Sequence, residues 1–113
     1  MDKLTRYAEL IKSVVQEWAQ TGQSATEVET TLSFDDSRRN YLMVSAGWHR
    51  KERHHNIIFH AHVKDGKVWI EWDGTSPSIT EALIERGMAR EDMVLNWQSP
   101  AVRALLDAQA SHA

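Results

Sequence analysis

The dipeptide Asp65-Gly66 constrains the fold of this chain more than any other feature, because Asp-Gly between two alternating segments is the strongest local signal for a β-hairpin. The two segments together span residues 54–75. A two-residue turn also sets which residues face each other across the hairpin. Outward from the turn, the predicted pairs are Lys64 with Lys67, Val63 with Val68, His62 with Trp69, Ala61 with Ile70, His60 with Glu71, and Phe59 with Trp72.

This register sorts the side chains of the hairpin onto two faces, because successive residues of a strand point to opposite sides. The first face is apolar and is expected to belong to the core; it carries Phe59, Ala61, Val63, Val68, Ile70 and Trp72. The second face mixes polar and aromatic side chains and is expected to be an interface or a site; it carries Ile58, His60, His62, Trp69, Glu71 and Asp73. A shift of one residue would exchange the two faces.

A helix is predicted from about Asp2 to Gln20, because apolar residues recur there at spacings of three and four. Asp2 is its expected N-cap and Gly22 its expected stop. The apolar stripe consists of Leu4, Tyr7, Ala8, Ile11, Val14, Val15 and Trp18. We expect this stripe to pack on the apolar face of the hairpin, against Phe59, Ile70 and Trp72.

Two more strands are predicted between this helix and the hairpin. Val28 to Phe34 and Tyr41 to Trp48 both alternate between apolar and polar residues. A turn at residues 35–40 joins them, and a loop from Arg50 to His55 is expected to lead into the hairpin. Short connections place consecutive strands side by side, so the four strands are predicted to form an antiparallel meander.

Two shorter helices are predicted after the hairpin. Ser78 stands three positions before Glu81, which is the spacing of a capping box, and Ser99-Pro100 begins the last helix. We expect that last helix to face the body through Val102, Leu105 and Leu106. A turn at residues 90–92 and an extended edge segment at residues 93–97 separate the two helices. The predicted fold is a single α+β domain over residues 1–113, with an N-terminal helix packed on a four-stranded antiparallel meander sheet and two shorter helices after it.

Composition excludes several classes of function. The 113 residues include no cysteine, which excludes disulfides, thiolate metal sites and a cysteine nucleophile. A formal net charge of -3 provides no global attraction to nucleic acid. No run of about 18 apolar residues occurs, so we expect a cytoplasmic protein without a membrane partner.

Three residues of the second hairpin face could form a metal-binding site. Two imidazoles and a carboxylate, from His60, His62 and Glu71, can bind a transition metal. The competing interpretation is hydrogen bonding to neighbours, and we favour it because a two-residue histidine spacing arises by chance in a chain with six histidines. Neither a nucleophile elbow nor a phosphate-binding glycine loop occurs in the sequence. We therefore expect no enzyme activity, no cofactor and no metal; a metal-dependent enzyme at these three residues is the least favoured alternative.

The segment from Arg50 to His55 is the one basic cluster of the chain. Arg50, Lys51 and Arg53 could meet the phosphates of a nucleic acid, which makes a direct nucleic-acid-binding protein the other alternative. Glu52 lies among them, however, and a single loop lacks the extended basic surface of most nucleic-acid binders. We favour a solvated loop, with DNA involved only indirectly.

The whole chain resembles the XisI family of fdxN element excision controlling factors. The resemblance is carried by Gly47-Trp48, Arg53, His60, the run Lys64-Asp65-Gly66-Lys67-Val68-Trp69-Ile70, Asp73, Thr75, Asp92, Val94-Leu95, Pro100 and Arg103. The sequence departs from the family pattern at His62, Glu71, Ser76 and Ala89, and it diverges after Arg103. Since His62 and Glu71 are not family features, the metal hypothesis becomes weaker still.

The resemblance implies a small α+β protein that is similar to regulators required, together with a recombinase, for programmed excision of a DNA element. XisI-like proteins are commonly encoded beside XisH-like proteins, which resemble restriction endonucleases. We therefore expect a non-catalytic control subunit that binds a XisH-like partner and self-associates. The interface candidates are Trp48, Arg53, His60, Trp69, Asp73 and Arg103.

Two expectations about these candidates have alternatives. For Arg53, Asp73 and Arg103, the competing interpretation is an intrachain ion pair that fixes a loop or a helix end. For Trp69, we expect another chain to cover its face of the hairpin, because an exposed ring beside Ile58 would form an apolar patch. The alternative is that the C-terminal helices cover Trp69 within the monomer.

Overall fold

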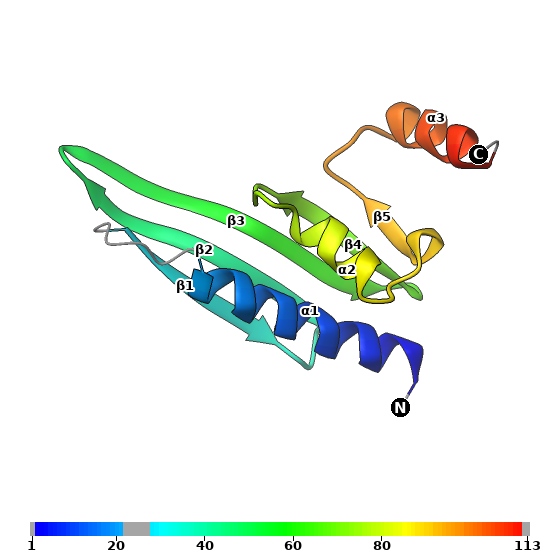
Figure 1. Cartoon of the computed structure of the whole chain (residues 1–113), viewed down its shortest axis with the longest axis horizontal. Coiled ribbons are helices and arrows are strands. Elements are labelled where there is room, and N and C mark those ends of the chain that lie inside the picture. Colours follow the sequence, from blue (N-terminus) through cyan, green and yellow to red (C-terminus); the bar gives the residue numbers. More distant parts are fainter. Residues whose placement is uncertain (1, 22–27, 112–113) are drawn as a thin grey trace.

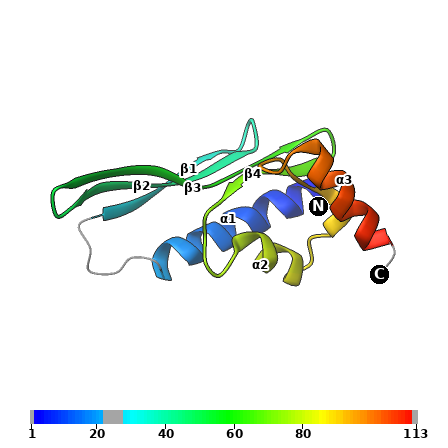
Figure 2. The ribbon, with the colours of Figure 1, turned by 90° about the horizontal axis from the view of Figure 1, so that it is seen from above.

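A computed structural model describes residues 2–21 and 28–111 of the chain, with side chains placed up to Ala108. One sheet contains five strands in the order β1-β2-β3-β4-β5, and α1 and α2 lie together on one of its faces (Figures 1 and 2). The elements are α1 (Lys3–Thr21), β1 (Val28–Asp35), β2 (Asn40–His49), β3 (Glu52–Lys64), β4 (Lys67–Asp73), α2 (Ile79–Glu85), a 3-10 turn η1 (Arg90–Asp92), β5 (Met93–Leu95) and α3 (Pro100–Ser111). The predicted α+β class, with a helix, a mainly antiparallel sheet and two further helices, is confirmed.

The sheet has one strand more than predicted. Strands β1 to β4 form the expected antiparallel meander, and β5 adds to β4 in the parallel direction. A parallel neighbour requires a crossover connection, and the segment that contains α2 and η1 supplies it. The predicted edge segment at residues 93–97 therefore becomes a strand at Met93–Leu95.

Helix α1 follows its sequence pattern closely. Its first turn is capped by Asp2, whose carboxylate accepts a hydrogen bond from the Thr5 backbone N–H at 2.8 Å. The apolar stripe is buried over Tyr7, Ala8, Ile11, Val14, Val15 and Ala19. It shares one core with Phe59 and Ile70 of the sheet, as predicted. The predicted stop at Gly22 lies outside the described residues.

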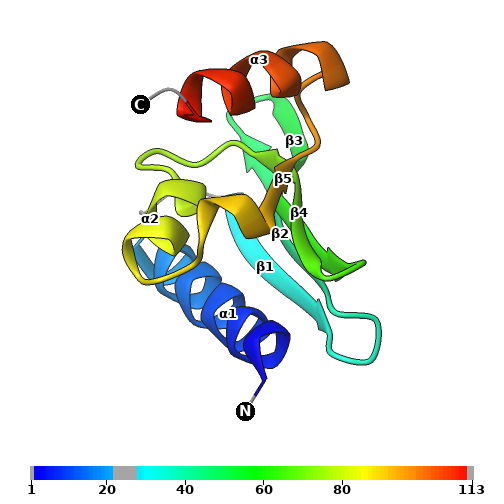
Figure 3. The ribbon, with the colours of Figure 1, turned by 90° about the vertical axis from the view of Figure 1, so that its right-hand side faces the viewer.

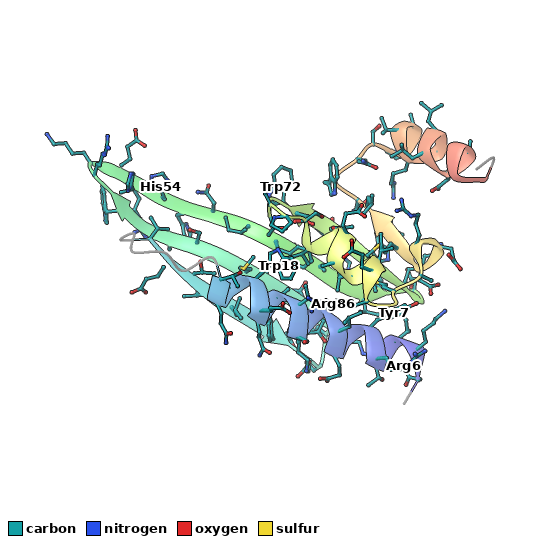
Figure 4. The ribbon with its side chains drawn as sticks, in the orientation of Figure 1. Arg6, Tyr7, Trp18, His54, Trp72 and Arg86 are labelled. Atoms are coloured by element: carbon teal, nitrogen blue, oxygen red, sulfur yellow. The ribbon has the colours of Figure 1, made fainter. Side chains whose placement is uncertain are left out.

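Helix α2 shares the core of α1 through Ile79, Ala82 and Leu83, and its C-cap residue Arg86 adds a polar link to α1. Its guanidinium forms an ion pair with Glu17 at 2.7 Å and lies 5.6 Å from the ring centre of Trp18 (Figure 4). At the other end of α2, the Ser78 hydroxyl accepts a hydrogen bond from the Glu81 N–H at 3.2 Å, so the predicted N-cap is confirmed.

The Asp65-Gly66 turn has the backbone conformation that its sequence predicts. Both residues have positive φ, 53° and 76°, as a type I′ turn requires. The predicted register holds from Lys64–Lys67 to Ala61–Ile70.

Beyond Ile70 the predicted register is wrong, because a β-bulge inserts Glu71 as an extra residue in β4. His60 now faces Trp72, and Phe59 faces Asp73. A one-residue shift exchanges the two faces of a strand. Trp72, predicted in the core, is therefore 51% exposed, and Asp73 turns toward the helices.

A second bulge lies between β2 and β3 at Ile58. Met43 faces Phe59 and Val44 faces Ile57, which leaves Ile58 as the unpaired extra residue. Ile58 was predicted on the face opposite the core, but it packs against the core instead. The outward position passes to Ile57, which is 50% exposed.

The predicted loop from Arg50 to His55 is also wrong. Strands β2 and β3 stay paired as far as His49–Glu52, so only Arg50 and Lys51 form the turn. The two strands extend beyond the helices as a long arm, which β1 accompanies as far as the Val28–Gly47 pair, in a molecule that measures 48 × 33 × 22 Å (Figures 1 and 2). The basic cluster thus lies at the tip of an extended hairpin.

Helix α3 lies at the opposite end of the molecule from the arm tip (Figure 1) and away from α1 (Figure 3). The predicted orientation of its apolar residues is largely wrong. Its apolar residues were expected to face the body, but Val102, Leu105 and Leu106 are 44%, 65% and 42% exposed. Arg103, Ala104, Leu106 and Asp107 line the space between α3 and the body, so Leu106 is the only one of the three predicted residues that borders it. Among the described residues, no helix has the length and apolar character needed to cross a bilayer.

Candidate functional site

A polar cluster crosses the sheet on the face opposite the helices. His60 of β3 donates from Nε2 to the side-chain oxygen of Asn40 at 2.7 Å. His62, two residues on, donates from Nε2 to the Glu71 carboxylate at 2.8 Å, and the Asn96 side-chain amide donates to the same carboxylate at 2.8 Å. The cluster thus ties together β2, β3, β4 and the end of β5. Glu71 was predicted opposite His60; the bulge that carries Glu71 brings it to His62 instead.

Burial and hydrogen bonding determine whether His60 and Glu71 are charged. Burial lowers the pKa of His60, and the adjacent His62 lowers it further, so His60 is neutral at pH 7. Burial alone would raise the pKa of Glu71. The hydrogen bonds from His62 and Asn96 outweigh burial, and the pKa of Glu71 lies below its usual value. The cluster therefore contains an ionised carboxylate that its neighbours already satisfy.

The three residues of the metal hypothesis line one hollow of about 490 Å³, together with Arg38 and Asn40. Within residues 2–21 and 28–111, no three His, Asp or Glu side chains are arranged so that they could hold a metal ion. The Nε2 atoms of both histidines are directed at protein oxygens. Hydrogen bonding to neighbours, the interpretation we favoured, thus describes this geometry.

Trp69 is covered by its own strand neighbours. Its ring stacks on His62 with the ring centres 6.2 Å apart and 14° between the planes. The Trp69 indole N–H donates to the Lys64 carbonyl at 3.0 Å, and the Lys64 ammonium lies 6.0 Å from the ring centre. The ring stack, the cation contact and the side-chain hydrogen bond of Trp69 thus all come from β3, and Trp69 pairs with Val94 of β5 on its other side.

Asp73 holds the connection between β4 and α2. One carboxylate oxygen accepts from the backbone N–H and the hydroxyl of Thr75, and the other accepts from the Ser78 hydroxyl and from the N–H and hydroxyl of Thr80. These are intrachain contacts, as the alternative for Asp73 required, but they are hydrogen bonds and not an ion pair. Asp73 thus fixes the backbone that leads into α2.

Trp48 and Arg53 face each other near the tip of the arm. The Arg53 guanidinium lies 5.9 Å from the Trp48 ring centre, a cation–π contact in place of an ion pair. Trp48 is 53% exposed, and Arg53 is exposed as well. The sequence therefore identified two residues that the structure brings together on an accessible surface.

Arg103 lies at the other end of the molecule, in a cavity of about 630 Å³ between α3 and the segment from α2 to β5. Its Nε and the side-chain oxygen of Gln98 are both buried without a hydrogen-bond partner among the described residues. Buried polar atoms normally have partners. Two buried polar atoms at this end of the molecule thus lack a partner among the described residues.

Several exposed apolar residues were missed as site candidates. Trp72 was assigned to the core, Trp97 was not considered, and the α3 stripe was expected to be buried; Trp72 and Trp97 are 51% and 48% exposed. The sequence carried no signal for the exposure of Trp97, because the helix that follows it was expected to face the body. The six sequence candidates thus do not form one site: they are divided among the arm tip, the outer face of the sheet, the β4–α2 connection and α3.

Comparisons with known proteins give a consistent result. The family model described as XisI protein matches residues 1–109. A XisI-like protein from Anabaena variabilis has 34% sequence identity and a TM-score of 0.81, covering 88% of this chain and 91% of that chain. The fdxN element excision controlling factor XisI from the same organism has 30% identity and a TM-score of 0.76, covering 90% and 99%. The chain has no match among curated proteins. The family resemblance seen in the sequence is confirmed.

Proposed function

This chain belongs to the XisI family, and from that premise we propose that it is a non-catalytic control subunit in the excision of a DNA element, acting by binding a XisH-like protein. One of the similar structures carries the name of an excision controlling factor, at 30% identity over nearly the whole of both chains. The match over residues 1–109 is the observation that carries the proposal.

The C-terminal end of the molecule is the surface that we assign to the protein partner. A 12-residue helix is marginally stable unless tertiary contacts support it, yet Val102 and Leu105 of α3 face outward, and Leu106 is still 42% exposed. Trp97 is exposed in the connection just before α3. An exposed apolar patch of this kind is typical of an interaction surface. Burial of the patch by a partner would also enclose Arg103.

The polar cluster on the sheet supports a non-catalytic role. His62 and Glu71 bind each other, and His60 is engaged by Asn40. Their hydrogen bonds join four strands, which is a structural use of these groups. A general base must lie within hydrogen-bond distance of a substrate proton. The Nε2 atoms of His60 and His62 are instead directed at Asn40 and Glu71 of the same chain.

We predict that Leu105→Asp prevents association with a XisH-like protein without unfolding the subunit. Leu105 is 65% exposed, so a carboxylate at that position stays hydrated in the free protein. Within the interface the same carboxylate would be desolvated, at a cost of about 3 kcal/mol or more, which weakens binding by at least about 100-fold. Co-expression followed by affinity purification of one tagged protein measures this loss.

Ile57→Asp is the matched control, because Ile57 is also an exposed aliphatic residue but lies on the arm. It should leave co-purification unchanged. Sedimentation of the subunit alone tests the expected self-association, since a second copy on α3 would be released by the same Leu105→Asp variant. If the two wild-type proteins do not associate when co-expressed, the proposed function is wrong; if both variants still associate normally, the assignment of the surface to α3 is wrong.

A further inference from the structure

The tip of the β2–β3 arm concentrates positive charge in a chain that is negative overall. Arg50, Lys51 and Arg53 lie within four positions, with Glu52 as the one acidic residue among them. All four are exposed, and the chain as a whole has a formal net charge of -3. This charge lies at one end of the molecule, as the position of His54 beside the tip and of Arg6 at the far end shows (Figure 4).

The tip is also a two-stranded ribbon of limited length. The described part of β1 pairs with β2 only as far as Val28–Gly47. From Trp48 to Arg53 the paired strands are β2 and β3, over about three residues on each side, or roughly 10 Å at the rise of a β-strand. The major groove of B-DNA is about 12 Å wide and 8.5 Å deep, and it admits a two-stranded ribbon. The tip therefore matches this groove in shape.

The backbone at Arg50 adds an independent observation. Arg50 has φ 59°, a conformation that favours glycine, asparagine or aspartate. Arg39 has a similar φ of 51°, but its guanidinium donates to the Thr5 hydroxyl at 3.1 Å, an intrachain contact that accounts for an arginine there. The Arg50 guanidinium has no hydrogen bond or ion pair to any residue that the structure describes. A cation thus occupies a strained turn position without an internal partner.

From these observations we propose that the arm tip binds double-stranded DNA, with Arg50, Lys51 and Arg53 meeting phosphates at the edges of the major groove. The contact of Arg53 with the Trp48 ring, at 5.9 Å, holds this guanidinium along the ribbon. An A-form RNA duplex fits less well, because its major groove is too deep and narrow for side chains to enter. The proposal goes beyond the proposed function, since it assigns a second surface to a partner other than protein.

Fluorescence anisotropy of a labelled DNA duplex of about 20 base pairs, titrated with the full chain alone, tests the proposal. Three phosphate contacts imply a slope of roughly -2.7 for log K against log salt, so binding should weaken about 40-fold between about 50 and 200 mM salt. The triple variant Arg50→Gln, Lys51→Gln, Arg53→Gln should weaken binding at least about 10-fold at low salt and flatten the slope.

The matched control removes three positive charges from the body instead, at the exposed residues Arg6, Lys67 and Arg90, each changed to Gln. It has the same net charge as the tip variant, and its affinity should stay within about twofold of the wild type. A second tip variant replaces residues 48–53 by Asn-Gly, which closes the hairpin directly on the Gly47–His54 pair and should bind as weakly as the triple variant. Circular dichroism confirms that each variant is folded.

Several results would overturn the proposal. The first is that the wild-type protein does not bind the duplex at low salt. The second is that the tip and body variants lose DNA affinity equally. The third is that the protein binds a single strand or an RNA duplex more tightly than the DNA duplex. Since the assay contains no partner protein, its failure is distinct from a failure to co-purify with a XisH-like protein. Conversely, the tip variants should still co-purify with that partner, because α3 is unchanged in them.

Discussion

Replacing Ile70 by Asp is expected to cause the largest loss of stability of any variant considered for this protein. Ile70 is fully buried in β4, within the core that α1 covers. A carboxylate there would be buried without a partner, and we expect the free energy of unfolding to fall by about 4–5 kcal/mol. Domains of this size are stable by about 5–15 kcal/mol, so the variant should lose between about a third and nearly all of its stability. Ile11→Asp in α1, also fully buried, tests the helix side of the same contact.

Trp72→Asp provides the matched control for Ile70→Asp, two residues further along β4. A regular hairpin would place both residues in the core, whereas the bulge at Glu71 leaves Trp72 51% exposed. We therefore expect Trp72→Asp to change the free energy of unfolding by no more than about 1 kcal/mol. Thermal melts followed by circular dichroism compare the variants. Equal destabilisation at the two positions would contradict the bulge, and an unchanged melt for Ile70→Asp would contradict the packing of α1 on the sheet.

Asp73→Asn is expected to produce the second large loss of stability. Each carboxylate oxygen of Asp73 accepts one backbone N–H, from Thr75 at 3.0 Å and from Thr80 at 2.9 Å. Either orientation of an asparagine amide would direct its NH₂ group at one of these N–H donors. Because hydrogen bonds to charged groups contribute about 1.5–3 kcal/mol each, we expect a loss of about 2–4 kcal/mol, or roughly 10 °C or more in Tm.

The effect of Asp73 should depend on pH in a defined direction. Burial raises the pKa of Asp73, but the hydrogen bonds from Thr75 and Thr80 outweigh burial and place its pKa below the usual value. In the unfolded chain the pKa is about 3.9, so the stabilisation is fully present above that pH and is lost as the pH falls through the lower folded-state value. The difference in stability between wild type and Asp73→Asn should therefore be constant from about pH 5 to 8 and shrink below about pH 4.

Asp65→Asn serves as the control for Asp73→Asn, because it makes the same chemical change in a turn where Asn-Gly is as favourable as Asp-Gly. Its melting temperature should match that of the wild type at neutral pH. Should Asp73→Asn melt like Asp65→Asn, the hydrogen-bond network of the β4–α2 connection contributes little to stability, and Asp73 becomes available as an interface residue. Urea unfolding at pH 7 and near pH 3.5 completes the comparison.

Features that depend on a few neighbouring residues could be predicted from the sequence. The Asp65-Gly66 turn, the caps at Asp2 and Ser78 and the stripe of α1 all have the expected structure. Each is specified locally, by φ preference, by a side-chain oxygen within reach of an N–H, or by a helical period. The family resemblance could also be recognised in the sequence, because the matching residues occur in the same order and at the same spacing as in the family.

The candidate site could be predicted only in pieces. Trp48 and Arg53 were identified, and they meet because β2 and β3 pair almost to the turn. His60 and Glu71 do share one face, but the partner of Glu71 is His62. The exposed residues Trp72 and Trp97 were missed, since hydrophobicity predicts burial and does not show which apolar residues the fold leaves outside.

The chain by itself determined the Asp65-Gly66 turn, the two caps and the main helix, because each of these features lies in a short segment. Tertiary structure alone decided the bulges at Ile58 and Glu71, the length of the arm and the rotation of α3. A bulge leaves the alternating pattern of a strand unchanged in the sequence but exchanges its faces in space. It is stabilised by distant groups: the Gly74 N–H donates to the Ile58 carbonyl at 2.8 Å, and Asp73 reaches Thr80 only when it faces the helices. These contacts exist only once the sheet and helices have come together.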